Sequence, residues 1–212
     1  MNFSDHFFAR LQKLPERRTL EFPKAKIPVN YHTAAVLLAF WPGKAGEVEV
    51  VFTRRTGTLS SHAGQVSFPG GRVDPADASL QATALREAHE EIGLRPEQAR
   101  IMGRVDDAWS RYGHHVIPFI GWLEEKPALT PNPEEVAEVI IADVETLMRP
   151  ENSRQHEVVV NNVSHMTQAF SWEGGYVWGL SADLMLELIL WIKDEPSNRG
   201  AVRLERMQTY GI

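Results

Sequence analysis

Three glutamates that could bind a metal, Glu87, Glu90 and Glu91, fall within five consecutive positions of a stretch with helical periodicity. At about 100° per residue, their side chains project within an arc of about 100°, beside the apolar stripe of the same helix. Like charges at this spacing repel, and carboxylates at the edge of a buried face lose part of their hydration. A divalent cation such as Mg²⁺ or Mn²⁺, which prefers oxygen ligands, would offset both effects. The alternative is a solvated acidic helix whose charges are paired with Arg86 and Arg95.

Two glycines precede this helix and strengthen the metal interpretation. Gly70 and Gly71 end a short strand-like segment, and glycine lets the backbone approach a ligand closely because it has no side chain. Arg54, Arg55 and Arg72 flank these glycines in the sequence. Because a guanidinium binds phosphate through two parallel hydrogen bonds, we expect at least one of the three to contact an anionic substrate. A glycine turn followed by a carboxylate-rich helix suits phosphates bridged by a metal ion.

The same residues resemble a known family motif, the Nudix box. REAHEEIGL, from Arg86 to Leu94, resembles the second half of the box at every specified position, and Gly71 stands where the box begins. The first half departs from the pattern, because the early acid is Asp77 rather than Glu and eight residues rather than seven separate it from the arginine. This longer variant, together with VFTRRTGTLSSHAGQVSFPGG upstream, is similar to the coenzyme A pyrophosphatase subgroup. Ser60 stands where that subgroup usually has arginine.

The resemblance implies a Nudix fold, an α/β (α+β) arrangement in which a mixed β-sheet is sandwiched between α-helices. It implies hydrolysis of a diphosphate, with Mg²⁺ or Mn²⁺ as cofactor and coenzyme A or a thioester of it as substrate. The products would be 4′-phosphopantetheine, or its acyl form, and adenosine 3′,5′-bisphosphate. The alternatives are a Nudix hydrolase of another nucleoside diphosphate derivative or of a nucleoside triphosphate, and a non-catalytic Nudix-fold binding module.

The resemblance also assigns roles to individual residues. Glu87 and Glu91 would be metal ligands, with Glu90 a ligand or the general base and the Gly70 carbonyl completing the shell. Arg86 would orient a carboxylate. The segment PEEVAE after the box offers a further ligand or base, Glu135 or Glu138, with a solvated acidic loop as the alternative. The candidates for substrate binding are Arg54, Arg55, His62, Gly64, Phe68, Gly71 and Arg72.

The composition of the chain limits which classes of protein and which partners are possible. A chain of 212 residues with 43% hydrophobic composition can bury one core. Its net charge of −6 argues against a broad nucleic-acid-binding surface, although residues 1–27 are basic and could help to hold an anion. The absence of cysteine excludes disulfides and thiolate metal sites, and no apolar run approaches the roughly 20 residues of a membrane span. We expect a cytoplasmic protein without membrane or nucleic-acid partners, with a homodimer as one option.

The elements that must position these residues follow from periodicity and turn signals. We expect an N-terminal helix and linker over 1–29, a catalytic domain over 30–192 and a tail over 193–212. Strands 34–41 and 48–55 should form a hairpin, and the box should form a helix over 79–92. Further strands are predicted over 65–71, 99–109, 115–124, 136–144, 156–162 and 169–179, the last as a hairpin, with helices over 144–150 and 182–194, the second capped by Ser181.

Overall fold

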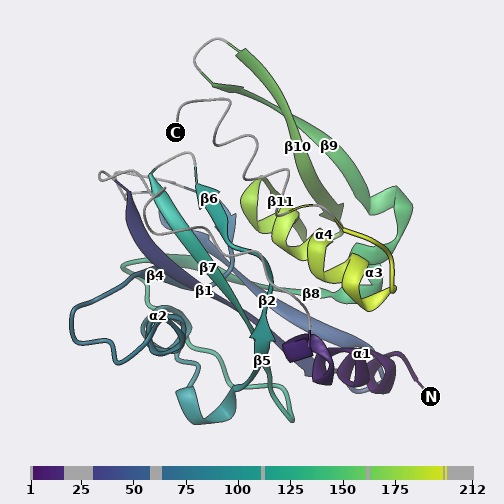
Figure 1. The fold of residues 1–212 in the computed structure, drawn as a ribbon, viewed down its shortest axis with the longest axis horizontal. Coiled ribbons are helices and arrows are strands. Elements are labelled where there is room, and N and C mark those ends of the chain that lie inside the picture. The colour runs from purple at the N-terminus through teal and green to yellow at the C-terminus, as the bar shows by residue number, and fades with distance from the viewer. Residues whose placement is uncertain are drawn as a thin grey trace.

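A mixed sheet forms the centre of the molecule (Figure 1). The computed structural model describes residues 2–16, 31–57, 64–110, 113–160, 163–197 and 199. Within these residues the sheet has eight strands, with the order β3-β2-β1-β7-β5, while β4 pairs with β1, β6 with β7 and β8 with β2. The strands are β1 (His32–Pro42), β2 (Val48–Arg55), β3 (Val66–Ser67), β4 (Gly70–Arg72), β5 (Arg100–Arg104), β6 (Ala108–Ser110), β7 (His114–Trp122) and β8 (Val136–Asp143).

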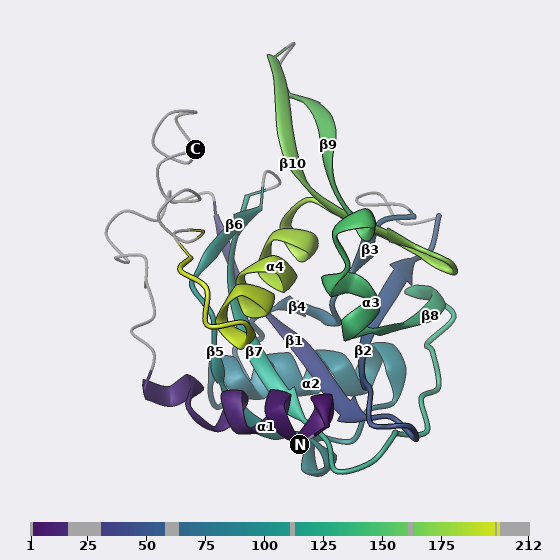
Figure 2. The ribbon, with the colours of Figure 1, turned by 90° about the vertical axis from the view of Figure 1, so that its right-hand side faces the viewer.

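Helices cover both faces of this sheet, which confirms the predicted sandwich (Figures 1 and 2). One face packs against α2 (Leu80–Ile92) through a core that includes Ala35 and Leu37. The other face packs against α1 (Phe3–Gln12), α3 (Val144–Met148) and α4 (Leu180–Ile192), through a core that includes Ala34 and Leu38. β1 is buried on both faces, which explains why its sequence is nearly continuously apolar.

A second, smaller sheet lies beside α4 (Figure 2). It is antiparallel and consists of β9 (Ser153–Val160), β10 (Val163–Trp172) and β11 (Gly175–Trp178), in the order β11-β10-β9. The predicted hairpin at 169–179 is confirmed by the β10–β11 pairing, and the hairpin of β1 and β2 by its antiparallel register. Short 3₁₀ helices at Leu14–Glu16, Pro96–Gln98 and Pro150–Asn152 complete the connections.

Two predicted strands are each divided in the structure. The stretch 99–109 forms β5 and β6, which both pair with β7, because residues 105–107 leave the sheet between them. The stretch 65–71 forms β3, which pairs with β2, and β4, which pairs with β1. The second division reflects the pairing of β4 with β1, a strand distant in sequence, which local patterns do not encode.

Two other boundaries differ from the prediction. Ser181 does not cap α4, because the helix begins at Leu180 with Gly179 as its N-cap residue. The Gly179 N–H donates to the Gln168 carbonyl at 2.9 Å, and its positive φ of 72° turns the chain from β11 directly into the helix. The strand predicted at 156–162 begins earlier, at Ser153, and residues 161–162 lie outside the described ranges.

The N-terminal helix packs on the main sheet. Phe7 and Leu11 are fully buried, and the Phe7 ring lies 5.2 Å from that of Phe40. Arg10 donates to the Trp191 carbonyl at 2.6 Å, which ties α1 to the end of α4. The domain division at residues 29 and 192 remains a prediction, and the basic residues at 17–27 lie outside the described ranges. No helix of the described residues has the length and apolarity needed to cross a bilayer.

Candidate active site

Helix α2 holds the three glutamates in place through its caps and its buried face. It begins where the Ser79 hydroxyl accepts from the Ala82 N–H at 3.1 Å, and it ends at Gly93 in the left-handed conformation. Ala88 and Ile92 are fully buried against the sheet. The glutamates therefore project from the edge of a helix that cannot rotate without exposing its core residues.

Strand β4 runs close beneath this helix, and both of its glycines are required for that approach. Gly70 has a φ of 154°, and a Cβ there would lie 2.4 Å from the Ala35 carbonyl oxygen. At Gly71 a Cβ would lie 2.5 Å from the Glu87 carboxylate. The backbone of β4 therefore borders the glutamates directly, because neither glycine carries a side chain.

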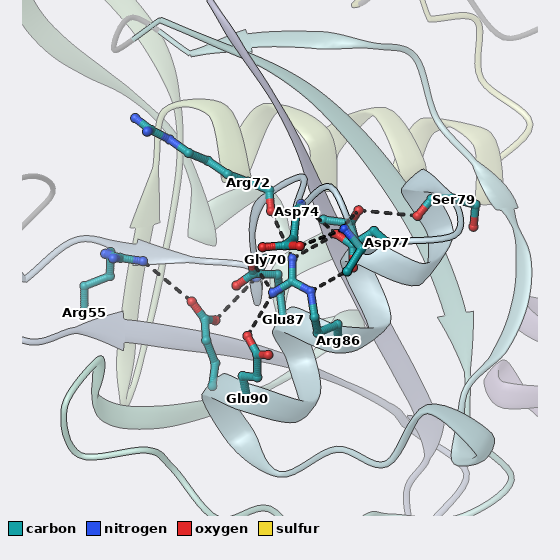
Figure 3. A network of polar contacts seen from close by, with 12 residues as sticks. Arg55, Gly70, Arg72, Asp74, Asp77, Ser79, Arg86, Glu87 and Glu90 are labelled. Atoms are coloured by element: carbon teal, nitrogen blue, oxygen red, sulfur yellow. Dashed lines mark hydrogen bonds and ion pairs between the residues drawn. The ribbon is translucent and has the colours of Figure 1, made fainter.

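Arg86 is the centre of a polar network that joins the box helix to the preceding loop (Figure 3). Its Nη1 donates to Glu87 and to Glu90, each at 2.9 Å, and its Nη2 donates to the Arg72 carbonyl at 3.0 Å. Nε and Nη2 also contact the two oxygens of Asp77, at 2.8 and 3.0 Å. One guanidinium thus fixes the positions of three carboxylates, consistent with the orienting role expected for Arg86.

The Asp77 variant of the box is explained by these contacts. Besides Arg86, its carboxylate accepts from the Thr83 hydroxyl at 2.8 Å and from the Asp74 N–H at 2.9 Å. The Arg86 hydrogen bonds hold the pKa of Asp77 far below its ordinary value, and Asp77 in turn raises the pKa of the guanidinium. The shorter acid and the longer loop together present a fully hydrogen-bonded carboxylate to Arg86.

Asp77→Asn should lower stability at neutral pH by roughly 1.5 to 3 kcal/mol, as expected for charge-assisted hydrogen bonds. The pKa of Asp77 is lower in the folded chain than in the unfolded chain. The contact therefore stabilises the fold at pH values above about 3.9, the pKa of an aspartate in the unfolded chain. This stabilisation is lost as the pH falls through the pKa that Asp77 has in the folded chain. Urea denaturation from pH 7 to pH 3 should therefore show a difference in stability that is constant down to about pH 4 and decreases below it. A constant difference across this range would contradict the assignment.

Glu91 is the most buried of the three glutamates. Its side chain is 3% exposed, and its Oε2 accepts from the Gly70 N–H at 3.3 Å. The Arg55 Nη1 lies 3.6 Å from Oε1. Burial raises the pKa of Glu91 to about 8 despite these two favourable contacts. In addition, the Arg55 Nε is buried without a hydrogen-bond partner among the described residues. The site therefore holds a carboxylate whose ionisation is opposed by burial and a guanidinium nitrogen that lacks an acceptor. Such groups are expected where a charged ligand binds.

The pKa of Glu87 is also raised. Burial is the largest cause, and the negative charges of Glu90 and Glu135 raise it further. Glu135 comes close because the segment before β8 docks on the end of α2, where the Asn132 N–H donates to the Glu91 carbonyl at 2.8 Å. Glu138 instead pairs with Arg54 across β2 and β8, with a distance of 2.8 Å. Of the two sequence candidates, Glu135 is therefore the one whose charge acts on the box glutamates.

The donor set suits a hard divalent cation. Carboxylates converge on the Gly70–Gly71 backbone, and hard cations prefer such oxygen ligands. Within the described ranges, however, no three Asp, Glu or His side chains are arranged to hold one ion together. The reason is that Glu87 and Glu90 point to Arg86 and Glu91 points to Arg55. Holding an ion would require these carboxylates to turn from the guanidiniums.

The remaining predicted substrate residues lie in different surroundings. Phe68 is 2% exposed and stacks on Phe52 at 4.6 Å, so its ring belongs to the core. Gly64 lies in a turn with a φ of 71°, where its N–H donates to the Arg55 carbonyl at 3.2 Å. His62 and Ser60 lie outside the described ranges. Arg72 is exposed, and its Nε donates to His114 at 3.2 Å.

Two contributors to the network were not predicted. Thr83 lies one helical turn before Arg86, and a threonine on a helix carries no motif. His114 lies 42 residues after Arg72 in the sequence. Helical spacing could have suggested Thr83, since residues three apart share a face. No local signal could have suggested His114.

Comparisons with known proteins point to one family. The NUDIX domain family matches residues 30–163. The chain is 34% identical to Nudix hydrolase 22, chloroplastic, of Arabidopsis thaliana, over 82% of this chain but 61% of that protein. It is 33% identical to the uncharacterized Nudix hydrolase NudL of Photorhabdus laumondii, over 78% of this chain and 87% of that protein.

The chain thus spans about three fifths of the plant relatives and most of the bacterial one. Among solved structures, a Nudix hydrolase from M. smegmatis, RenU, matches with a TM-score of 0.47 and 25% identity, over 55% of this chain and 73% of that one. With the family match covering more than half of the sequence, the protein belongs to the Nudix hydrolase family.

Proposed function

We propose that the protein hydrolyses the diphosphate of coenzyme A or of its thioesters in the cytoplasm. The proposal of hydrolysis is supported by the arrangement of the site, in which Glu87, Glu90 and Glu91 lie together with Arg86 beside the Gly70–Gly71 backbone. The choice of coenzyme A is supported by the similarity of the upstream segment and of the longer box to one subgroup. The net charge of −6 favours a small-molecule substrate over nucleic acid.

Glu87, Glu90, Glu91 and the Gly70 carbonyl would hold Mg²⁺ or Mn²⁺. Bound there, the cation would neutralise the diphosphate and lower the pKa of a coordinated water molecule. Arg86 holds Glu87 and Glu90 beside the site, from which they would turn toward the ion, and the lack of side chains at Gly70 and Gly71 lets a ligand approach the backbone of β4. Burial of Glu91 strengthens each electrostatic interaction at this end of the helix.

The proton of the attacking water needs an acceptor, and we assign it to Glu135. Water attacks one phosphorus, the bond from that phosphorus to the bridging oxygen breaks, and the water proton passes to a carboxylate. Glu90 is the alternative, but one of its oxygens already accepts from Arg86 at 2.9 Å. Glu135 acts electrostatically on both Glu87 and Glu91, so it lies beside the site without being held by the same guanidinium.

A panel of diphosphates incubated with Mg²⁺ or Mn²⁺ tests this proposal. We expect coenzyme A to be converted to 4′-phosphopantetheine and adenosine 3′,5′-bisphosphate with a higher kcat/KM than ADP-ribose or nucleoside triphosphates. Chelation with EDTA should abolish turnover, and readdition of the metal should restore it. Better turnover of a nucleoside triphosphate or of ADP-ribose would replace the substrate assignment. Failure to cleave any diphosphate would favour a binding module.

A further inference from the structure

Arg72 and its partner His114 lie immediately beyond the proposed diphosphate site. Arg72 follows Gly71 in β4, and successive side chains of a strand point to opposite faces. Gly71 pairs with Ala35 and borders Glu87, whereas Arg72 pairs with Ala34, whose side chain belongs to the core on the α1 and α4 side. The Arg72 side chain therefore projects on the face opposite the glutamates, and Figure 3 shows it extending away from them.

His114 positions the Arg72 side chain without neutralising its charge. The Arg72 Nε donates to the His114 Nε2 at 3.2 Å. A guanidinium has no acceptor, so the His114 Nε2 must accept, and the ring proton of the neutral imidazole lies on Nδ1. That nitrogen is 3.3 Å from the Ser110 hydroxyl. The contact fixes the Nε atom of Arg72, and Figure 3 shows the guanidinium extending away from the glutamates.

Each of the other described arginines around the box lies beside at least one carboxylate. Arg54 pairs with Glu138, Arg55 with Glu91, and Arg86 with three carboxylates. Among the described residues, Arg72 forms no ion pair, and its terminal nitrogens have no hydrogen-bond partner. In a chain of net charge −6, Arg72 is thus a described arginine beside the site whose charge no carboxylate neutralises, and it can bind an anion.

The edge of β4 connects the two faces. Within the described ranges β4 pairs only with β1, so its other edge has no strand beside it. A ligand that passes this edge can contact Glu87 and Glu91 on one face and Arg72 on the other. We infer that the Arg72–His114 pair binds a phosphate monoester carried on the nucleotide half of the substrate, at a distance from the diphosphate that is cleaved. This inference rests on the proposed function and adds the residue that determines specificity.

Matched ligands with and without the monoester test the inference. For coenzyme A and its 3′-dephospho form, Arg72→Ala should lower the ratio of the two kcat/KM values by about tenfold or more, the effect of losing one charge-assisted contact. Most of the change should be in KM, because the contact is distant from the reacting phosphorus. His114→Ala should shift the ratio in the same direction by a smaller factor. Arg100→Ala, which changes an exposed arginine at the far end of β5, should leave it unchanged.

A binding measurement separates this inference from the hydrolysis itself. By isothermal titration calorimetry, the wild-type protein should bind adenosine 3′,5′-bisphosphate more tightly than adenosine 5′-monophosphate, and Arg72→Ala should remove the difference. If coenzyme A is not hydrolysed but this difference is found, the proposed substrate fails and the phosphate site stands. Equal affinities in wild type, or an undiminished difference in Arg72→Ala, would overturn the site. If Arg54→Ala alone removes the preference, recognition belongs to the end of β2 instead.

Discussion

Glu91→Gln should fold normally and lose at least about a hundredfold in kcat. Replacing groups that merely support metal ligands costs about 10- to 100-fold, so the loss of a ligand itself should cost no less. The amide keeps the size of the side chain and can still accept from the Gly70 N–H, but it is a poor ligand for a hard cation. The loss should therefore appear in turnover and in metal binding rather than in folding.

Stability without metal should change in the opposite direction to activity. The 3% exposed side chain of Glu91 carries a carboxylate whose ionisation is opposed by burial. A neutral amide avoids that cost, so the melting temperature of Glu91→Gln in EDTA should equal or exceed that of wild type. Millimolar Mg²⁺ or Mn²⁺ should raise the wild-type melting temperature by mass action and raise that of Glu91→Gln less.

Glu97→Gln provides the matched control for this experiment. Glu97 lies in the 3₁₀ helix just after the box, its side chain is 68% exposed, and its nearest cation is Arg95 at 3.6 Å. The substitution is chemically identical but lies outside the site, so kcat and the metal-induced shift should match wild type. Wild-type turnover by a folded Glu91→Gln protein would remove Glu91 from the metal site.

The parts of the site that are local in sequence could be predicted, and the parts that depend on distant contacts could not. The limits of α2 follow from Ser79 and Gly93, whose capping contacts involve residues within five positions. The sequence predicted Ser181 as the cap of α4, whereas the N-cap residue is Gly179, whose N–H donates to Gln168 on another strand. Local propensity therefore located the helix without fixing its first residue.

Among the candidate catalytic residues, too, some positions follow from local sequence and others depend on distant contacts. The spacing of Glu87, Glu90 and Glu91 shows that they share a helix edge, so their proximity was predictable. Choosing Glu135 over Glu138 required the pairing of β2 with β8, which places Arg54 opposite Glu138. The position of a carboxylate relative to a site is decided by which cation on a neighbouring strand already holds it, and no sequence pattern contains that information.

Arg86→Lys should reduce kcat/KM by about tenfold to a hundredfold and destabilise the fold by roughly 1 to 3 kcal/mol, although it preserves the charge. Arg86 makes five contacts of 2.8 to 3.0 Å, to Asp77, Glu87, Glu90 and the Arg72 carbonyl. A lysine ammonium has three donors at one point and cannot reach these acceptors together. Arg95→Lys, at a 64% exposed position after the helix, is the control and should leave both quantities near wild type.

A double-mutant cycle with Asp77→Asn decides whether Asp77 acts through Arg86. If its role is to hold the guanidinium by two hydrogen bonds, removing Asp77 from the Arg86→Lys protein should cost little further activity. Steady-state kcat/KM of wild type, both single variants and the double variant gives the coupling. Additive losses would mean that Asp77 contributes separately, through its bonds to Thr83 and Asp74. Strong coupling would identify the aspartate and the lengthened loop as an alternative way of fixing the arginine that orients the box glutamates.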